Sequence, residues 1–171
     1  MRIVRGFWSI LLVLAGCGRA PPARLVDRIS AEDELYAMAT REVLDEPRIP
    51  ARYDLGQDDM LYCLDLHGRS PHPAVLARFA SHPVRVGPRT ACAPSGWHPL
   101  PEGGEALSLP LKFDAIDWSD PEKPLVHAVL PVITGYEGFE LEMRFSRDGE
   151  RWRVSHRSLE FYSCTENERL W

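Results

Sequence analysis

Phe139-Glu140-Leu141-Glu142-Met143-Arg144-Phe145 alternates apolar with charged residues at every position. Alternation with a period of two predicts a β-strand with one buried face, so the four apolar residues of this stretch should point inward. Arg147-Asp148-Gly149-Glu150 follows as a tight-turn sequence, and Trp152-Arg153-Val154-Ser155-His156 resumes the alternation. The stretch therefore predicts a β-hairpin around Asp148-Gly149, with His156 on the face of Trp152 and Val154.

Two further apolar segments precede this hairpin. Residues 107–113 place leucine or phenylalanine at every second position, which predicts another strand. Residues 125–133 are apolar on both faces except for His127, which predicts a strand covered on both sides. Pro131 cannot donate a ladder hydrogen bond, so we expect a bulge or bend there. The C-terminal third should form an antiparallel meander of three to four strands.

The N-terminal part of the chain mixes helical and strand-like segments. Ser30 opens a capping-box-like sequence, so a helix over 31–45 should follow and end before Pro47. The remaining predicted elements are a loop over 49–59, a strand over 60–66, a short helix over 73–79 capped by Ser70 or His72, a strand over 84–86 and a long surface loop over 91–105.

This order of elements predicts an α+β fold with an N-terminal helix, a strand-helix-strand segment and then the C-terminal antiparallel meander. It excludes a doubly wound sheet, because helices and strands do not alternate along the whole chain. A helix followed by an antiparallel sheet that ends in a hairpin is similar to the NTF2-like or cystatin-like rolls. That resemblance rests on the order of the elements.

The start of the chain carries a targeting signal. Arg2 and Arg5 precede an apolar run over 6–14, which is the pattern of a secretory signal peptide and is too short for a membrane-spanning helix. Leu14-Ala15-Gly16-Cys17 follows and resembles the lipobox of bacterial lipoprotein precursors. In that family the cysteine thiol receives a diacylglycerol, and the signal peptidase cuts just before it. The alternative is an ordinary signal peptide with an incidental cysteine.

The resemblance implies a lipid-anchored protein outside the cytoplasm. Residues 1–16 would be the signal peptide, residues 17–29 a tether from acylated Cys17, and residues 30–171 a single α+β domain. Gly18 stands where an aspartate often marks retention in the inner membrane of Gram-negative bacteria. The expected location there is the outer membrane, facing the periplasm.

The composition excludes some partners. Loss of residues 1–16 removes two of the 20 basic residues and none of the 25 acidic ones, which leaves a net charge of −7. This charge argues against nucleic acid as a partner and against a basic patch that binds anionic lipid. The chain also lacks GxSxG, phosphate-loop and CxxC motifs. We expect the membrane and an unknown protein or envelope component as partners, and no cofactor.

Three cysteines remain if Cys17 carries lipid, and only one pair can form within the chain. Cys63 lies in the strand over 60–66, and Cys92 follows the short strand over 84–86. The helix between these strands could return the chain beside its start, so we favour a disulfide between Cys63 and Cys92. The alternatives are either cysteine paired with Cys164, or three reduced thiols.

His127 and His156 are the candidates for chemistry, because each sits in an apolar strand. If the sheet curls, both could line its concave side with Trp152 and act as a general acid and base in a cavity. The alternative is that each is a half-buried histidine bonded to the backbone.

Other polar and aromatic residues give weaker signals. The remaining histidines lack the spacing of zinc ligands and read as solvated loop residues: His67, His72, His82 and His98. Asp117, Asp120 and Glu122 lack the ligand ladder of a calcium loop, so no metal site is predicted. Tryptophans in the expected loops could stack on a carbohydrate: Trp97 and Trp118, with Trp152 in the core and Trp171 at the end.

Three functions follow from these signals. The first is a lipid-anchored envelope protein that binds a partner without catalysis. The second is an enzyme or small-ligand binder with a cavity lined by His127 and His156. The third is an inhibitor-like or immunity-like module that acts on another envelope protein. A concave pocket with convergent polar groups distinguishes the second from the others.

Overall fold

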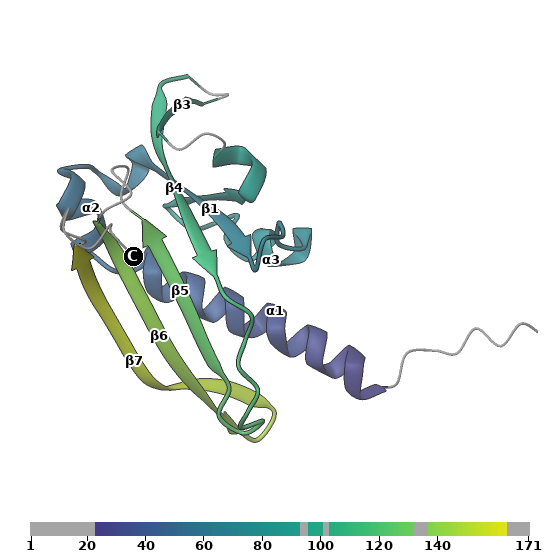
Figure 1. Cartoon of the computed structure of the whole chain (residues 1–171). Helices are drawn as coiled ribbons and strands as arrows, with labels where there is room; N and C mark the ends of the chain where they lie inside the picture. The colour runs from purple at the N-terminus through teal and green to yellow at the C-terminus, as the bar shows by residue number, and fades with distance from the viewer. Residues whose placement is uncertain (1–22, 93–95, 101–102, 132–136, 164–171) are drawn as a thin grey trace, which may run out of the picture.

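A mixed sheet of seven strands forms the centre of the protein, and helices pack beside it (Figure 1). The computed structural model describes residues 23–92, 96–100, 103–131 and 137–163. The helices and 3₁₀ turns are α1 (Ala23–Leu44), α2 (Arg48–Tyr53), η1 (Gln57–Asp59), α3 (Pro73–Ala77) and η2 (Arg89–Cys92). The strands are β1 (Met60–Leu66), β2 (Arg85–Pro88), β3 (Gly96–Pro99), β4 (Glu105–Phe113), β5 (Leu125–Pro131), β6 (Glu137–Asp148) and β7 (Arg151–Ser163).

The sheet has the strand order β2-β1-β4-β5-β6-β7, and β3 pairs with β4 off this path. β1 runs parallel to both β2 and β4, whereas β4, β5, β6 and β7 form an antiparallel meander. The short helix α3 makes the crossover between the parallel strands β1 and β2, which two-residue turns cannot join. The meander is as predicted, but the parallel pairs make the sheet mixed.

The core lies between α1 and one face of the meander, which we call the inner face. Figure 1 shows α1 crossing the strands diagonally on that side. Leu35, Ala39 and Val43 of α1 are buried at a spacing of four residues, as expected for one face of a helix. The ring of Tyr36 packs edge-on against Phe113 of β4, with 5.4 Å between ring centroids. Burial of this helix face is the main apolar contact between helix and sheet.

The hairpin prediction is confirmed. β6 pairs with β7 from Glu137↔Ser163 to Asp148↔Arg151, and Gly149 takes a positive φ of 64° in the turn. The four apolar residues of β6 are all on the inner face and at most 5 % exposed: Phe139, Leu141, Met143 and Phe145. The strand predicted over 60–66 matches β1, and the His72 ring caps α3 by accepting a hydrogen bond from the Ala74 amide at 3.2 Å.

The helix α1 begins earlier than predicted. It starts at Ala23 and not at residue 31, so residues 23–29 of the predicted tether are helical. The sequence over 23–44 contains neither proline nor glycine, and Ser30 is an interior residue of the helix. Arg28 and Glu32 form an i,i+4 ion pair at 3.2 Å across the predicted boundary, which supports this turn of the helix.

Several loop and strand predictions were wrong in detail. Residues 49–59 contain α2 and η1, and residues 91–105 contain β3, whose sequence Gly-Trp-His-Pro does not alternate apolar with polar residues. Ser108 of β4 holds Gly96 of β3 by hydrogen bonds to its amide and carbonyl, at 3.1 and 2.9 Å. β5 is covered on one face and half-buried on the other. It pairs with β6 without a bulge over the described residues up to Pro131, and residues 132 and 133 of the predicted strand lie outside the described residues.

The disulfide prediction is confirmed. Cys63 of β1 and Cys92 of η2 are bonded, with 5.8 Å between their Cα atoms. The bond closes 29 residues of sequence that include α3 and β2. It therefore fixes the parallel edge of the sheet to its neighbour, and in the chain-entropy view it stabilises the fold by about 3 to 4 kcal/mol. Cys164 lies outside the described residues.

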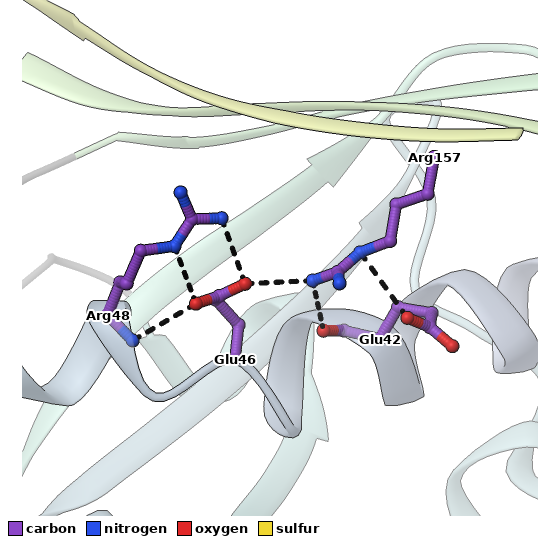
Figure 2. Close-up of polar contacts among 4 residues, drawn as sticks. All are labelled: Glu42, Glu46, Arg48 and Arg157. Carbon is purple, nitrogen blue, oxygen red and sulfur yellow. Dashed lines mark hydrogen bonds and ion pairs between the residues drawn. The ribbon is translucent and has the colours of Figure 1, made fainter.

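A network of charges joins the C-terminal end of α1 to β7 (Figure 2). Arg48 binds the Glu46 carboxylate through Nε and Nη2, at 2.7 and 3.0 Å. Arg157 of β7 donates from Nη2 to Glu46 Oε2 at 2.9 Å, the oxygen that also accepts from Arg48 Nη2, and its Nε lies 3.3 Å from Glu42 Oε2. The Glu46 side chain is 7 % exposed. Desolvation by burial raises the pKa of its carboxyl group, but the hydrogen bond from Arg48 outweighs this effect and lowers the pKa to about 2.

Met143→Lys should destabilise the protein by more than about 3 kcal/mol, because the ammonium group would be buried on the inner face without a partner. Glu142→Lys is the matched control. It places the same side chain one residue away on the exposed face and should cost less than about 1 kcal/mol. Urea unfolding measures both values, and near-parental stability of Met143→Lys would contradict the assigned faces.

Glu46→Gln should lower the free energy of unfolding by about 2 kcal/mol at neutral pH, because two arginines lose their shared carboxylate. The folded pKa lies below the ordinary value of 4.5, so this stabilisation is present above pH 4.5 and disappears as the pH falls towards 2. The two proteins should converge in stability over that range. Glu42→Gln, at an exposed partner of Arg157, should show a smaller and less pH-dependent loss. A constant difference down to pH 2 would contradict the role of Glu46.

Candidate functional site

His127 lies on the outer face of the sheet, opposite α1. Its Nδ1 is 2.6 Å from Asp114 Oδ2, and its Nε2 is 2.7 Å from Glu140 Oε1. Partial burial lowers the pKa of His127, but the hydrogen bonds to these two carboxylates outweigh it and raise the pKa above 6.5. Both ring nitrogens are occupied, so His127 ties β5 to β6 and to the loop after β4.

A β-bulge places His156 on the outer face as well. Arg144 pairs with His156 and Phe145 pairs with Val154, so one step along β6 corresponds to two along β7. Ser155 is the extra residue, and its hydroxyl donates to the Arg144 carbonyl at 3.1 Å. The prediction that His156 shares the face of Trp152 and Val154 is therefore wrong, since the bulge reverses the alternation.

The proposed cavity of His127, His156 and Trp152 is consequently not formed by the described residues. Trp152 is 6 % exposed on the inner side, whereas both histidines are on the other side of the sheet. The hollow beside His156, of about 310 Å³, is lined by polar side chains of β6 and β7: Glu140, Glu142, His156, Ser158 and Glu160. No group of three or more His, Cys, Asp or Glu residues in the described part of the chain is arranged to hold a metal ion.

A cleft at the N-terminal end of α1 gathers more distinctive chemistry. It has a volume of about 420 Å³, and we call it the Arg-Trp cleft. Three segments that are far apart in the sequence line it: α1, the loop between β4 and β5, and the β6–β7 hairpin. Its lining residues are Arg28, Ala31, Trp118, Pro121, Glu122, Arg147 and Trp152.

Two tryptophans and two arginines build one wall of the cleft. The rings of Trp118 and Trp152 meet edge to face, with 6.1 Å between centroids. The Arg28 guanidinium lies 5.3 Å from the Trp118 centroid, and the Arg147 guanidinium lies 5.0 Å from that of Trp152. Each guanidinium is thus stacked on an indole, which holds its N–H donors in a fixed plane.

Glu32 holds one half of this wall in place. Its Oε1 accepts a hydrogen bond from Trp118 Nε1 and lies next to Arg28 Nε, both at 3.2 Å. The Asp117 and Asp120 carboxylates shape the same loop by accepting hydrogen bonds from the amides of Ser119 and Glu122, at 2.8 and 3.0 Å. These aspartates therefore stabilise the loop itself, as expected for a turn.

Two lining residues carry charges without an ionic partner. Within the described ranges, neither Arg147 nor Glu122 forms an ion pair with the other or with any other residue. Arg28 is paired with Glu32 through Nε, which leaves its two Nη groups. The cleft thus presents the N–H donors of two guanidiniums and the acceptor oxygens of one carboxylate to a ligand.

The other residues named from the sequence lie elsewhere. Trp97 is 52 % exposed on β3, beside the start of β4, whereas Trp118 follows the end of β4. His82 and His98 line a separate hollow of about 550 Å³ next to β2. Cys17 and Trp171 lie outside the described residues. None of the helices that the structure describes combines the length and the apolar character that crossing a membrane requires.

Reasoning from the sequence does not single out Arg28 or Arg147 as site residues, and it considers Glu122 only as a calcium ligand and rejects that role. Trp118 was named as an exposed stacking residue and Trp152 as a core residue, and the structure brings the two together. The sequence signal for Arg147 was its place at the start of a tight turn, which fixes its position but not its neighbours. Comparisons of the chain with protein-family models, with curated proteins and with solved structures give no match.

Proposed function

We propose that this chain is a lipid-anchored protein of the bacterial cell envelope that binds the oxyanion group of a ligand in the Arg-Trp cleft without catalysis. The lipobox-like sequence ending at Cys17 supports the anchor. The resemblance to NTF2-like or cystatin-like rolls rests on the order of the elements and stays a prediction.

The unpaired guanidinium of Arg147 is the observation on which the binding proposal rests. It is stacked on Trp152 and faces a cleft, without a carboxylate partner among the described residues. Planar guanidinium donors bind carboxylate or phosphate groups in two-point contacts. An oxyanion bound in the cleft would form the ion pair that Arg147 lacks among the described residues.

The surroundings of the histidines favour binding over catalysis. A general base needs a free ring nitrogen near the reacting proton, but both nitrogens of His127 are engaged by carboxylates. His156 lies on the open outer face and shares no cavity with Trp152. The residues of the cleft offer donors, a carboxylate and aromatic surface, which are sufficient for recognition.

The anchor is tested by Cys17→Ser, which should release the protein from the membrane fraction, because the thiol that would receive the lipid is gone. Cys164→Ser is the matched control and should leave the protein with the membrane. Fractionation of cells at high salt measures both. Cys17→Ser protein that remains entirely with the membrane would contradict the anchor.

The cleft is tested with inorganic phosphate as the probe, by calorimetric titration of the full-length protein. Arg147→Gln should weaken phosphate binding about tenfold, because the neutral amide keeps much of the side-chain shape but loses the charge. Arg153→Gln is the control on the same hairpin, since Arg153 pairs with Asp148 and does not line the cleft. Equal affinity in all three proteins would refute the proposed site.

A further inference from the structure

The Arg-Trp cleft is close to the proposed anchor along the chain. Only residues 18–22 separate Cys17 from Ala23, the first residue of α1. A fully extended chain spans at most about 3.6 Å per residue, so the N-terminal end of α1 lies within about 20 Å of an acylated Cys17. Arg28, on the second turn of that helix, lines the cleft. The bilayer that holds the lipid is thus the surface nearest to the cleft.

The charges of the cleft are of both signs. Arg147 would attract an anion, but Glu122 in the same lining would repel it. A simple cation would be attracted by Glu122 and repelled by Arg147 and Arg28. Only a ligand that carries a positive and a negative group on one short skeleton satisfies both, with its anion at the guanidiniums and its cation at the carboxylate.

Residues near the cleft suit the interface of a bilayer. Trp118, which is half-buried, and Pro121 are in the loop that forms one side of the cleft. Ile29 of α1 is 55 % exposed and follows Arg28 in the sequence, but it lines a separate hollow with Leu66. Tryptophan is enriched at the headgroup level of membranes, where one end of the ring is in apolar surroundings and the other in water. The exposed side chains at this end of the molecule therefore include apolar as well as charged groups.

We infer that the Arg-Trp cleft binds the phosphate-ammonium zwitterion of a phosphatidylethanolamine headgroup in the bilayer that carries the anchor. The inference rests on the proposed lipid anchor and names the ligand of the proposed site. Arg147 and the Nη groups of Arg28 donate to the phosphate oxygens, and Glu122 accepts hydrogen bonds from the primary ammonium. A choline group, which has no N–H donor, cannot make the second contact.

The overall charge of the protein agrees with a zwitterionic lipid. The chain from residue 17 onwards has a net charge of −7, so an anionic bilayer surface repels it. A headgroup of zero net charge avoids this repulsion and still gives the guanidiniums a phosphate. Binding would hold the hairpin and the loop against the membrane and so fix the orientation of the domain.

The test uses the full acylated protein in an uncharged, phosphate-free detergent, with glycerophosphoethanolamine, glycerophosphocholine and glycerophosphate as calorimetric probes. Glycerophosphoethanolamine should bind at least about tenfold more tightly than the other two. Glu122→Gln and Arg147→Gln should each weaken its binding about tenfold, and Arg153→Gln should leave it unchanged. Phosphatidylethanolamine in phosphatidylcholine vesicles that carry the protein should compete with added glycerophosphoethanolamine.

Each other result overturns the inference in a distinguishable way. If Glu122→Gln strengthens binding of glycerophosphate and does not affect glycerophosphoethanolamine, the cleft is an anion site, so the proposed function stands and the zwitterion inference fails. If phosphatidylethanolamine in the vesicles does not compete, the ligand is a soluble ester and the bilayer source is wrong. If none of the probes binds, both proposals fail. Fractionation of Cys17→Ser tests the anchor separately, because the titrations with soluble glycerophosphoesters in detergent do not depend on it and only the vesicle competition does.

Discussion

The packing of α1 against the inner face of the meander is the contact on which the rest of the structure depends. Apolar side chains buried along α1 supply most of the free energy of this contact. Polar groups at the two ends of the helix fix its orientation on the sheet. At one end Glu32 joins Arg28 to Trp118, which packs on Trp152. At the other end Arg157 joins the helix to the middle of β7. Both ends of α1 are therefore connected to the edge strand β7. The Arg-Trp cleft lies at the end where Glu32 binds Trp118.

The bulge in β7 decides which side chains reach which face. It adds Ser155 between two otherwise regular halves of β7. Trp152 therefore points to the core side, and His156 points outward. Arg157 points to the core side again and reaches Glu42 of α1 and Glu46 after it. Bulges also twist an edge strand and so reduce its tendency to pair with other chains. Strict alternation cannot show such an insertion, because the sequence over 152–156 reads as continuous. The histidine cavity predicted from the sequence is not formed by the described residues, because His127 lies on the outer face of β5, away from Trp152, and the bulge turns His156 to that outer face as well.

Local patterns predicted the parts of the fold that local forces decide. The period of β6, the turn at Gly149 and the His72 cap follow from neighbouring residues, and the structure has them. The disulfide was also predictable, because few pairings were available and the crossover between parallel strands brings its ends together. The Arg-Trp cleft was not, since Arg28, Glu122 and Arg147 become neighbours only when three distant segments meet. Whether a charged side chain has an ionic partner can be seen only in the three-dimensional structure.

Hydrogen exchange of the acylated protein tests most directly which surface meets the membrane. Exchange in phosphatidylethanolamine vesicles is compared with exchange in an uncharged detergent. If the Arg-Trp cleft holds the headgroup, exchange should slow in the three segments that line it, the first turns of α1, the loop between β4 and β5 and the β6–β7 hairpin, and stay the same along β1 and β2. Slower exchange confined to the hollow beside β2, or none anywhere, would contradict the account.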